Sequence, residues 1–269
     1  MKKSSRTDTA PLEFRHIRSP LGEITLAGQG EFLTGVEFLD QTPSALPAES
    51  GHTGSSLPVL KAAEQWLERY FEGEDPGETP PIHLTGTPFR LAVWEQLRRI
   101  PRGETTTYGA IAAELARQLG IPRMSAQAVG GAVGHNPVGI LIPCHRVVGS
   151  DGNLTGFASG LRRKFRLLAL EGLDMSRYPL PPPRGGSDLR QIPGVGPNIE
   201  QDLFRIGIRR IADLAGEDPE QLYRDDCAVK RFQEDRCQLY VFRLAVYFAE
   251  HPHPEPEKLR WSWWKDHRQ

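Results

Sequence analysis

Apolar positions in the first 85 residues follow the short periods of a small α/β unit. A Ser-, Pro- and Gly-rich stretch over 41–56 predicts a loop, and apolar residues at helical spacing after it predict a helix over 57–71. Three earlier segments alternate or run apolar between turn residues, which predicts strands: FRHI (14–17), GEITLA (22–27) and FLTGVEF (32–38).

From residue 86 the pattern changes to short helices joined by turns. An apolar face predicts a helix over 89–100, and the hydroxyl run TTT (105–107) is suited to cap a helix over 108–115. A Gly-Ile-Pro turn at 120–122 leads to a short helix of small residues over 125–133, so this pair of helices predicts a helix-turn-helix. The small surface of its second helix permits close approach to DNA or to another helix, and the sequence leaves both open.

Two further elements complete the central segment. After the turn at Asn136-Pro137, the apolar run VGILI (138–142) predicts a buried strand that ends at Cys144. A basic helix is predicted over 161–170, with Gly172 just beyond its end.

The C-terminal third has the pattern of an all-α domain behind a linker, YPLPPPRGG (178–186). The stretch LRQIPGVGPNI (189–199) is typical of a helix-hairpin-helix, with its second helix expected over 202–206. In that motif the backbone at Gly194, Val195 and Gly196 binds a phosphate oxygen. A helix over 237–249 and the closing WSWW (261–264) are expected to pack in a core.

The chain is therefore expected to have four parts: an α/β unit (1–85), a helix-turn-helix unit (86–173), a linker (174–187) and an all-α domain (188–269). Charge is unevenly spread among them. The formal net charge is −1, yet residues 86–172 hold 11 Lys and Arg against 5 Asp and Glu. A local basic surface of this kind is what contact with phosphates requires.

Composition excludes several classes of protein. No apolar run is long enough to span a bilayer, and MKKSSRT (1–7) is not followed by the apolar region of a signal peptide. Three cysteines without metal-binding spacing predict a protein of the reducing cytosol with no disulfide framework and no zinc site. Cys227 and Cys237 are expected in the core.

Cys144 lies in IPCHRV (142–147), where its neighbours indicate chemistry. A Cys at the end of a buried strand is most often a core residue. Pro143, however, ends the strand, and His145 and Arg146 bring positive charge or proton-accepting capacity to the sulfur. Such surroundings lower the pKa of a thiol and favour the nucleophilic thiolate, so a reactive cysteine is predicted.

Five motifs in order carry a resemblance to a known family: TTTYG (105–109), AVGGA (128–132), Asn136-Pro137, IPCHRV (142–147) and LALEG (168–172). Over about residues 12–172 the chain resembles the O6-alkylguanine-DNA alkyltransferases, also called methylated-DNA–protein-cysteine methyltransferases. The C-terminal part resembles the helical pathogenicity-locus family. The resemblance implies a ribonuclease H-like α/β subdomain, a mainly α helix-turn-helix domain and an all-α C-terminal domain.

The function implied is repair of double-stranded DNA by direct reversal. Minor-groove binding flips an O6-alkylguanine out of the stack, and a cysteine takes the alkyl group irreversibly. Whether O4-alkylthymine is a second substrate is left open by the sequence. No cofactor or metal is implied. A monomer is expected, and the C-terminal hairpin is expected to add non-specific DNA binding or to bind a protein partner.

The resemblance also assigns catalytic roles. Cys144 would be the alkyl acceptor, His145 the base that takes the thiol proton through a water, and Glu171 the residue that orients His145. Asn136 would support the turn beside the site, and Tyr108 would contact the flipped nucleotide and help to protonate the leaving guanine.

DNA and base contacts are implied at seven further positions: Arg123, Gln127, Ala128, Gly130, Arg146, Val147 and Ser159. The backbone at Val147 and the loop around Ser159 would read the guanine edge, whereas Arg146 is either a contact or structural. Gln127 stands where the family usually has an arginine that fills the gap left by the flipped base, and Arg123 would compensate for the lost charge.

Three alternatives remain open from the residues. The chain could be a sensor that binds alkylated DNA without reacting, although Cys144 beside His145 argues against it. A cysteine hydrolase would need an oxyanion hole and turnover. A DNA glycosylase would rest on the C-terminal hairpin alone.

Overall fold

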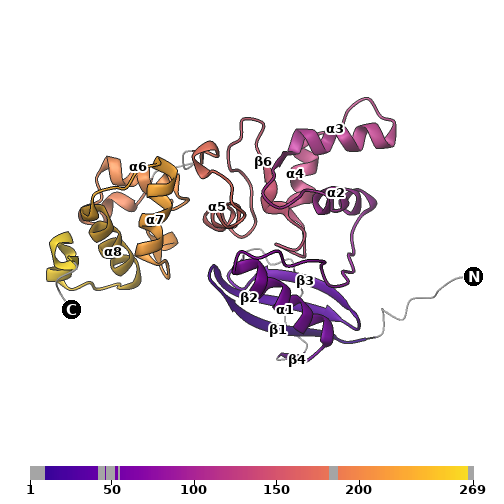
Figure 1. Ribbon diagram of the computed structural model, residues 1–269, viewed down its shortest axis with the longest axis horizontal. Helices are drawn as coiled ribbons and strands as arrows, with labels where there is room; N and C mark the ends of the chain where they lie inside the picture. The colour runs from indigo at the N-terminus through magenta and orange to yellow at the C-terminus, as the bar shows by residue number, and fades with distance from the viewer. Residues whose placement is uncertain (1–9, 42–45, 47–51, 54, 182–186, 266–269) are drawn as a thin grey trace, which may run out of the picture. The chain divides into compact units, whose positions relative to one another are not determined.

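The computed structural model describes residues 10–41, 46, 52–53, 55–181 and 187–265 (Figure 1). The chain divides into two compact units. The first comprises Met1–Asp151 with Gly156–Leu173, and the second comprises Gly152–Thr155 with Asp174–Gln269. The predicted N-terminal segment 1–7, much of the predicted loop 41–56 and the end of the linker lie outside the described residues.

The first unit opens with a four-stranded sheet covered by one helix. Its strands are β1 (Leu12–Ser19), β2 (Gly22–Gln29), β3 (Phe32–Phe38) and β4 (His52–Thr53), in the order β3-β2-β1-β4. The first three strands pair antiparallel, and β4 pairs parallel to β1. Helix α1 (Pro58–Phe71) packs on this sheet (Figure 1), as its apolar spacing predicted.

The rest of the first unit is mainly helical. Each predicted helix is confirmed: α2 (Pro88–Arg98), α3 (Tyr108–Leu119), α4 (Ala126–Gly134) and α5 (Leu161–Leu170). Thr107 caps α3 and Ser125 caps α4, since each side-chain hydroxyl accepts a backbone N–H of the first turn. Helices α3 and α4 pack against each other and against α2, which gives the helix-turn-helix pair.

One apolar core runs through the whole first unit. It contains buried residues of the sheet, such as Leu26, of the helices, such as Val93, and Cys144 itself. The sheet and the helical part therefore fold as one unit around the loop that carries the cysteine.

The predicted strand over 138–142 is wrong. Val138 makes a single parallel bridge to Val36 of β3, and Ile140 has a left-handed backbone with φ of 68°. A β-branched residue in that conformation cannot continue a strand. The segment is a folded loop, in which the N–H of Leu141 donates to the carbonyl of Gly139 and that of Ile142 to Val138. Its apolar residues signal burial without a β-ladder.

Two short strands join the ends of the site-bearing segments. Strand β5 (Thr106–Thr107) pairs parallel with β6 (Val147–Val148). This pairing brings the start of α3 next to the turn η1 (Cys144–Arg146).

The second unit is helical. Its longer helices are α6 (Pro197–Arg205), α7 (Pro219–Lys230) and α8 (Arg236–Glu250). Short 3-10 turns connect and flank them: η2 (Met175–Arg177), η3 (Leu189–Gln191), η4 (Ile211–Leu214), η5 (Pro256–Leu259) and η6 (Trp261–Trp264). The second hairpin helix was predicted at 202–206 but begins at Pro197, because proline suits the first helical position.

Two expectations about packing in this unit need revision. Cys237 is exposed at the start of α8, whereas Cys227 is half-buried. The WSWW turn is only partly packed, because Trp264 lies against Tyr247 with ring centroids 5.3 Å apart while Trp261 remains 39% exposed.

Candidate active site

Cys144 begins the η1 turn and is held by a loop that is fixed to the sheet. The N–H of Val36 in β3 donates to the carbonyl of Pro137, and the carbonyl of Val36 accepts the N–H of Gly139. The side chain of Asn136, which is buried, bonds the loop on both sides: Nδ2 donates to the carbonyl of Ile142 at 2.8 Å and Oδ1 accepts the N–H of Val138 at 3.1 Å. The cysteine therefore sits in a rigid, largely closed position, with 8% of the residue exposed.

His145, next in the turn, is completely buried and bound to Glu171. Its Nε2 lies 2.8 Å from Oε1 of Glu171, the residue that ends α5. Nδ1 of the same ring is buried and has no hydrogen-bond partner within the described part of the chain. Because a carboxylate only accepts hydrogen bonds, the proton of the neutral ring is on Nε2, and Nδ1 keeps its lone pair.

Arg146 completes this buried group. Its Nε donates to Oε2 of Glu171 at 2.9 Å, and a second nitrogen donates to Oε1 at 2.8 Å. A third bond reaches the carbonyl of Ile100 at 2.6 Å. Of the two roles that the sequence left open for Arg146, DNA contact or structure, these bonds favour the structural one.

The charges of Glu171 and His145 follow from these contacts. Burial alone would raise the pKa of Glu171, but the hydrogen bonds and charges of His145 and Arg146 outweigh it and hold that pKa well below its usual range. Burial lowers the pKa of His145, and this effect exceeds the opposing pull of Glu171. The site thus combines an anionic carboxylate with a neutral imidazole at neutral pH.

The pKa of the Cys144 thiol differs from the sequence prediction. The positive neighbours were expected to lower the pKa of Cys144, but burial raises it above its ordinary value. The bond to Asn136 and the charge of Lys164 oppose that rise without cancelling it. The neutral His145 adds no positive charge, so the thiol is protonated at rest and needs a base before it can attack.

Lys164 was not predicted as a site residue, yet it is completely buried beside the thiol. Its Nζ donates to the carbonyl of Val147 at 2.5 Å and to that of Gly156 at 3.3 Å. Burial lowers the pKa of Lys164 to about 8, and the charge of Cys144 opposes this. The sequence held a signal, since position 164 shares the inward face of its helix with Leu161, Phe165 and Leu168.

Tyr108 lies at the start of α3, half-buried next to the cysteine. Its hydroxyl donates to the carbonyl of Gly156 at 3.3 Å, and its ring is close to Gly130 of α4. Burial first, and then the charge of Cys144, raise the pKa of Tyr108 to about 12. The phenol therefore keeps its proton and can act as a donor.

The predicted readers of the guanine edge already have internal partners. Val147 is buried, and its carbonyl accepts the bond from Lys164. Ser159 donates its hydroxyl to Oε1 of Gln41 at 2.5 Å. Val147 lies directly after the η1 turn, whereas the bonds of Ser159 tie its loop to Gln41 and Arg163.

Helix α4 resolves the question that its small residues raised. Val129, Ala132 and Val133 are buried against the other helices, while Gln127 and Ala128 are exposed. Gly130 lies between these two faces, and Arg123 is exposed in the turn before the helix. One face of α4 thus packs inside, and a face of small residues with Gln127 is open for close approach.

The three hairpin residues lie at the start of α6 in the second unit. Gly194 has a left-handed φ of 88°, Val195 is buried, and Gly196 is the N-cap. Nearby, Glu200 in the first turn of α6 is paired with Arg190 at 2.8 Å.

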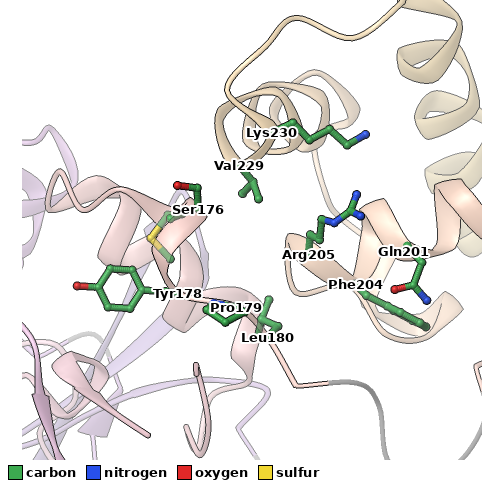
Figure 2. Close-up of a pocket in the computed structure, with 10 residues that line it drawn as sticks. Ser176, Tyr178, Pro179, Leu180, Gln201, Phe204, Arg205, Val229 and Lys230 are labelled. Carbon is green, nitrogen blue, oxygen red and sulfur yellow. The ribbon is translucent and has the colours of Figure 1, made fainter. Parts of the chain in front are cut away.

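The second unit also contains a surface cavity of about 400 Å³ (Figure 2). Tyr178 and Leu180 line it from the segment after η2, and Phe204 and Arg205 from α6. Arg205 is already paired with Asp202 at 2.5 Å. Lys230, the other charged residue of this wall, is also paired with Asp202. Both charged side chains of the wall thus have internal partners, and the cavity indicates no particular class of ligand.

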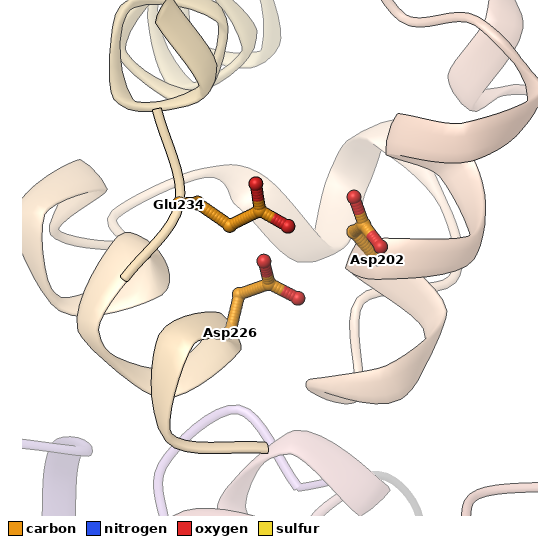
Figure 3. A group of neighbouring side chains, drawn as sticks. All are labelled: Asp202, Asp226 and Glu234. Atoms are coloured by element: carbon orange, nitrogen blue, oxygen red, sulfur yellow. The ribbon is translucent and has the colours of Figure 1, made fainter. Parts of the chain in front are cut away.

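Asp202, Asp226 and Glu234 form one group of potential metal ligands in the described part of this unit (Figure 3). The ammonium of Lys230 lies 2.8 Å from Asp202, 2.9 Å from Asp226 and 2.5 Å from Glu234. Lys230 therefore supplies the positive charge that a metal would bring, and the group joins α6 to α7 as an internal ion cluster.

Family models cover most of the chain. The 6-O-methylguanine DNA methyltransferase ribonuclease-like domain matches residues 14–79, and the DNA binding domain of the same name matches residues 88–173. A model described as Pathogenicity locus matches residues 184–269.

Complete proteins resemble the first unit. A methylated-DNA–protein-cysteine methyltransferase of Mycolicibacterium paratuberculosis is 45% identical over 160 residues, which are 60% of this chain and 92% of the relative. One of Haemophilus influenzae is 40% identical over 161 residues, 60% of this chain and 86% of the relative. The crystal structure of Mycobacterium tuberculosis OGT in complex with DNA matches with a TM-score of 0.53 at 42% identity, over 62% of this chain and 95% of that chain.

Proposed function

The chain belongs to the methylated-DNA–protein-cysteine methyltransferase family, and on that premise we propose that Cys144 is the residue that accepts the alkyl group. The protein repairs DNA by direct reversal, and DNA that contains O6-alkylguanine is its substrate. The observation that supports Cys144 is the buried His145–Glu171 pair next to it in the chain. The neutral His145 is bound to the anionic Glu171, and its Nδ1 has no partner among the described residues, so it can accept a proton.

The side chains around Cys144 can account for each proton and bond in the alkyl transfer. His145 Nδ1 takes the thiol proton, through a water, because the thiol is protonated at rest. The thiolate then attacks the alkyl carbon, so a C–S bond forms while the C–O6 bond breaks. The electron pair of that bond stays on the leaving guanine, which takes up the proton released from the thiol, while the phenol of Tyr108 keeps its own proton and assists as a hydrogen-bond donor. The product is a thioether on Cys144, which has no route back to the thiol, so each molecule acts once.

Base flipping brings the reacting carbon to this buried thiol. The exposed face of α4, with Gln127 and Ala128, is the surface that we propose for the minor groove. Gln127 can hydrogen-bond the orphan base but lacks the charge of an arginine, and the exposed Arg123, in the turn before α4, supplies a charge four positions earlier in the chain.

We also propose a role for the second unit in holding DNA. The left-handed Gly194 and the N-cap Gly196 leave the first backbone N–H groups of α6 without a side-chain cap, which suits a phosphate oxygen. Such a contact would be independent of sequence. A protein partner of this unit is the competing proposal.

The cellular place proposed for the reaction is the cytosol. No helix in the described ranges is both long and apolar enough to cross a membrane.

The test is the intact mass of the protein after incubation with duplex DNA that carries one O6-methylguanine. We expect one added methyl group per molecule, mapped to Cys144 and absent from Cys144→Ala. A second duplex with O4-methylthymine tests the wider substrate range. Damage-dependent binding without any added mass would instead identify a sensor, and a methyl group on another residue would remove Cys144 from this role.

A further inference from the structure

Tyr70 is a residue of the N-terminal sheet subdomain that reaches into the catalytic group of the other half of the unit. It lies in the last turn of α1 and is 1% exposed. Its hydroxyl donates to Oε1 of Glu171 at 2.8 Å, across 101 positions of the chain. Glu171 thus has a third hydrogen-bond donor, besides His145 and Arg146, that takes no part in the proposed proton transfer.

The oxygen that Tyr70 binds is the same one that holds the histidine. Oε1 of Glu171 lies 2.8 Å from Nε2 of His145 and 2.8 Å from a guanidinium nitrogen of Arg146. The hydroxyl of Tyr70 is also 3.4 Å from Nε2 of His145, and the two rings meet edge to face with centroids 6.5 Å apart. Tyr70 therefore contacts both members of the pair that sets the basicity of the site.

The phenol is held in place from several directions. Its ring stacks on Trp66 with centroids 5.5 Å apart and an interplanar angle of 9°. The guanidinium of Arg102 lies 5.5 Å from the ring centroid and donates to the carbonyls of Gly73 and Leu170. These contacts fix the direction of the hydroxyl, so its bond to Glu171 is built into the fold.

We propose that Tyr70 is a positioning residue of the alkyl transfer, which orients Glu171 and limits how strongly Glu171 holds a protonated His145. The inference rests on the proposed role of Cys144 and His145. A carboxylate oxygen that accepts three hydrogen bonds is a weaker partner for an imidazolium than one that accepts two. Removal of the hydroxyl would strengthen the hold of Glu171 on a charged His145, and the neutral base would then be available over a narrower pH range.

The test compares wild type with Tyr70→Phe, which keeps the ring and loses only the hydroxyl. The measured quantity is the single-turnover rate of methyl transfer from O6-methylguanine DNA, from about pH 5 to about pH 8. We expect the acid limb of the pH profile to move up by about one pH unit, so that the rate falls about tenfold on that limb and changes little near pH 8. DNA affinity and the final one-methyl stoichiometry should not change.

Leu60→Val is the matched control, because Leu60 is buried in the same helix and takes no part in the catalytic group. It should leave the rate and the pH profile as in wild type. An NMR titration of the His145 ring without DNA gives a second readout, and its pKa should be higher in Tyr70→Phe.

Three results would overturn the proposal. The first is a Tyr70→Phe protein with the rate and the pH profile of wild type. The second is a rate loss that Leu60→Val shares, with no movement of the acid limb, since this would show general loosening of α1. The third is failure of wild type to place a methyl on Cys144, which would first overturn the proposed function itself.

Discussion

Glu171 carries the electrostatics of the site at the scale of single residues. It is a buried carboxylate at the end of α5 that accepts bonds from His145, Arg146 and Tyr70. Its negative charge fixes the proton of His145 on Nε2, and this is why Nδ1 can serve as the base. The identity of one atom, an oxygen that cannot donate, thus determines which nitrogen of His145 keeps its lone pair.

Glu171→Gln tests this argument directly. The amide nitrogen of glutamine can donate to Nε2 of His145 and so favour the ring with its proton on Nδ1. We expect methyl transfer to slow by at least about 100-fold, because that tautomer cannot accept the thiol proton. Single-turnover kinetics with O6-methylguanine DNA measure the effect. A rate within about threefold of wild type would contradict the role of Nδ1 as the base.

The same variant has a predicted effect on stability. It leaves Arg146, whose side chain is only 11% exposed, without its anionic partner, which costs about 3 kcal/mol of unfolding free energy near neutral pH. The folded-state pKa of Glu171 is lowered, so its stabilising contribution is present above the unfolded pKa of about 4.3 and is lost as pH falls through the folded value. The difference in unfolding free energy between wild type and variant should therefore shrink below about pH 4.

Urea unfolding at several pH values checks this, with Glu114→Gln as the control. Glu114 is paired with Arg117 on the exposed face of α3, and its replacement should leave the unfolding free energy unchanged near neutral pH. A Glu171→Gln protein as stable as wild type would show that Arg146 does not depend on this carboxylate.

At the scale of elements, periodic apolar faces and the N-terminal strand segments were good predictors, whereas one short apolar run was not. Helices α1, α2 and α5 fall close to their predicted ranges because one stripe of each helix is buried. The run VGILI (138–142) is equally apolar, but its backbone bonds are made within a loop and by Asn136. Hydropathy reports burial and says nothing of which partner satisfies the backbone.

The candidate site shows the same limit. Cys144, His145 and Glu171 were found because local motifs carry them, and the structure brings them together. Tyr70 was visible only as one residue of an inward helical face, since its partner is 101 positions away. Contacts that join distant segments leave no period or spacing in the sequence.

The exposed face of small residues on α4 can be tested as a DNA-binding surface. A Cβ added at Gly131 would meet no atom within 4 Å, and the residue has an ordinary helical backbone. Gly131→Ala should therefore stabilise the free protein by about 0.5–1 kcal/mol. If this face enters the minor groove, the added methyl group and, more strongly, the side chain of Gly131→Leu should weaken DNA binding.

Fluorescence anisotropy with a short duplex measures that affinity, and thermal unfolding of the same samples shows that each variant is folded. Wild-type affinity in both variants would place the DNA on another surface. Loss of affinity together with higher stability would separate binding from folding, because the same methyl group then has opposite effects on the two.

At the scale of the whole molecule, relatives of this chain match its first unit over nearly their full length. The relative from Mycolicibacterium paratuberculosis is matched over 92% of its length by 60% of this chain, so a complete protein of that family has no counterpart of the second unit. A chain cut after Leu173 should therefore fold and transfer a methyl group to Cys144. The second unit would then have a role other than methyl transfer.

Salt dependence separates the two explanations for the second unit. Each phosphate contact adds about 0.9 to the slope of log affinity against log salt concentration on duplex DNA. If the start of α6 binds a phosphate, the full chain should bind undamaged duplex more tightly than the shortened chain and with a steeper slope by about one. Gly196→Asp in the full chain should remove this difference, because it places a negative charge at the N-cap where the phosphate would lie. Equal slopes for the full and shortened chains would leave a protein as the partner of the second unit.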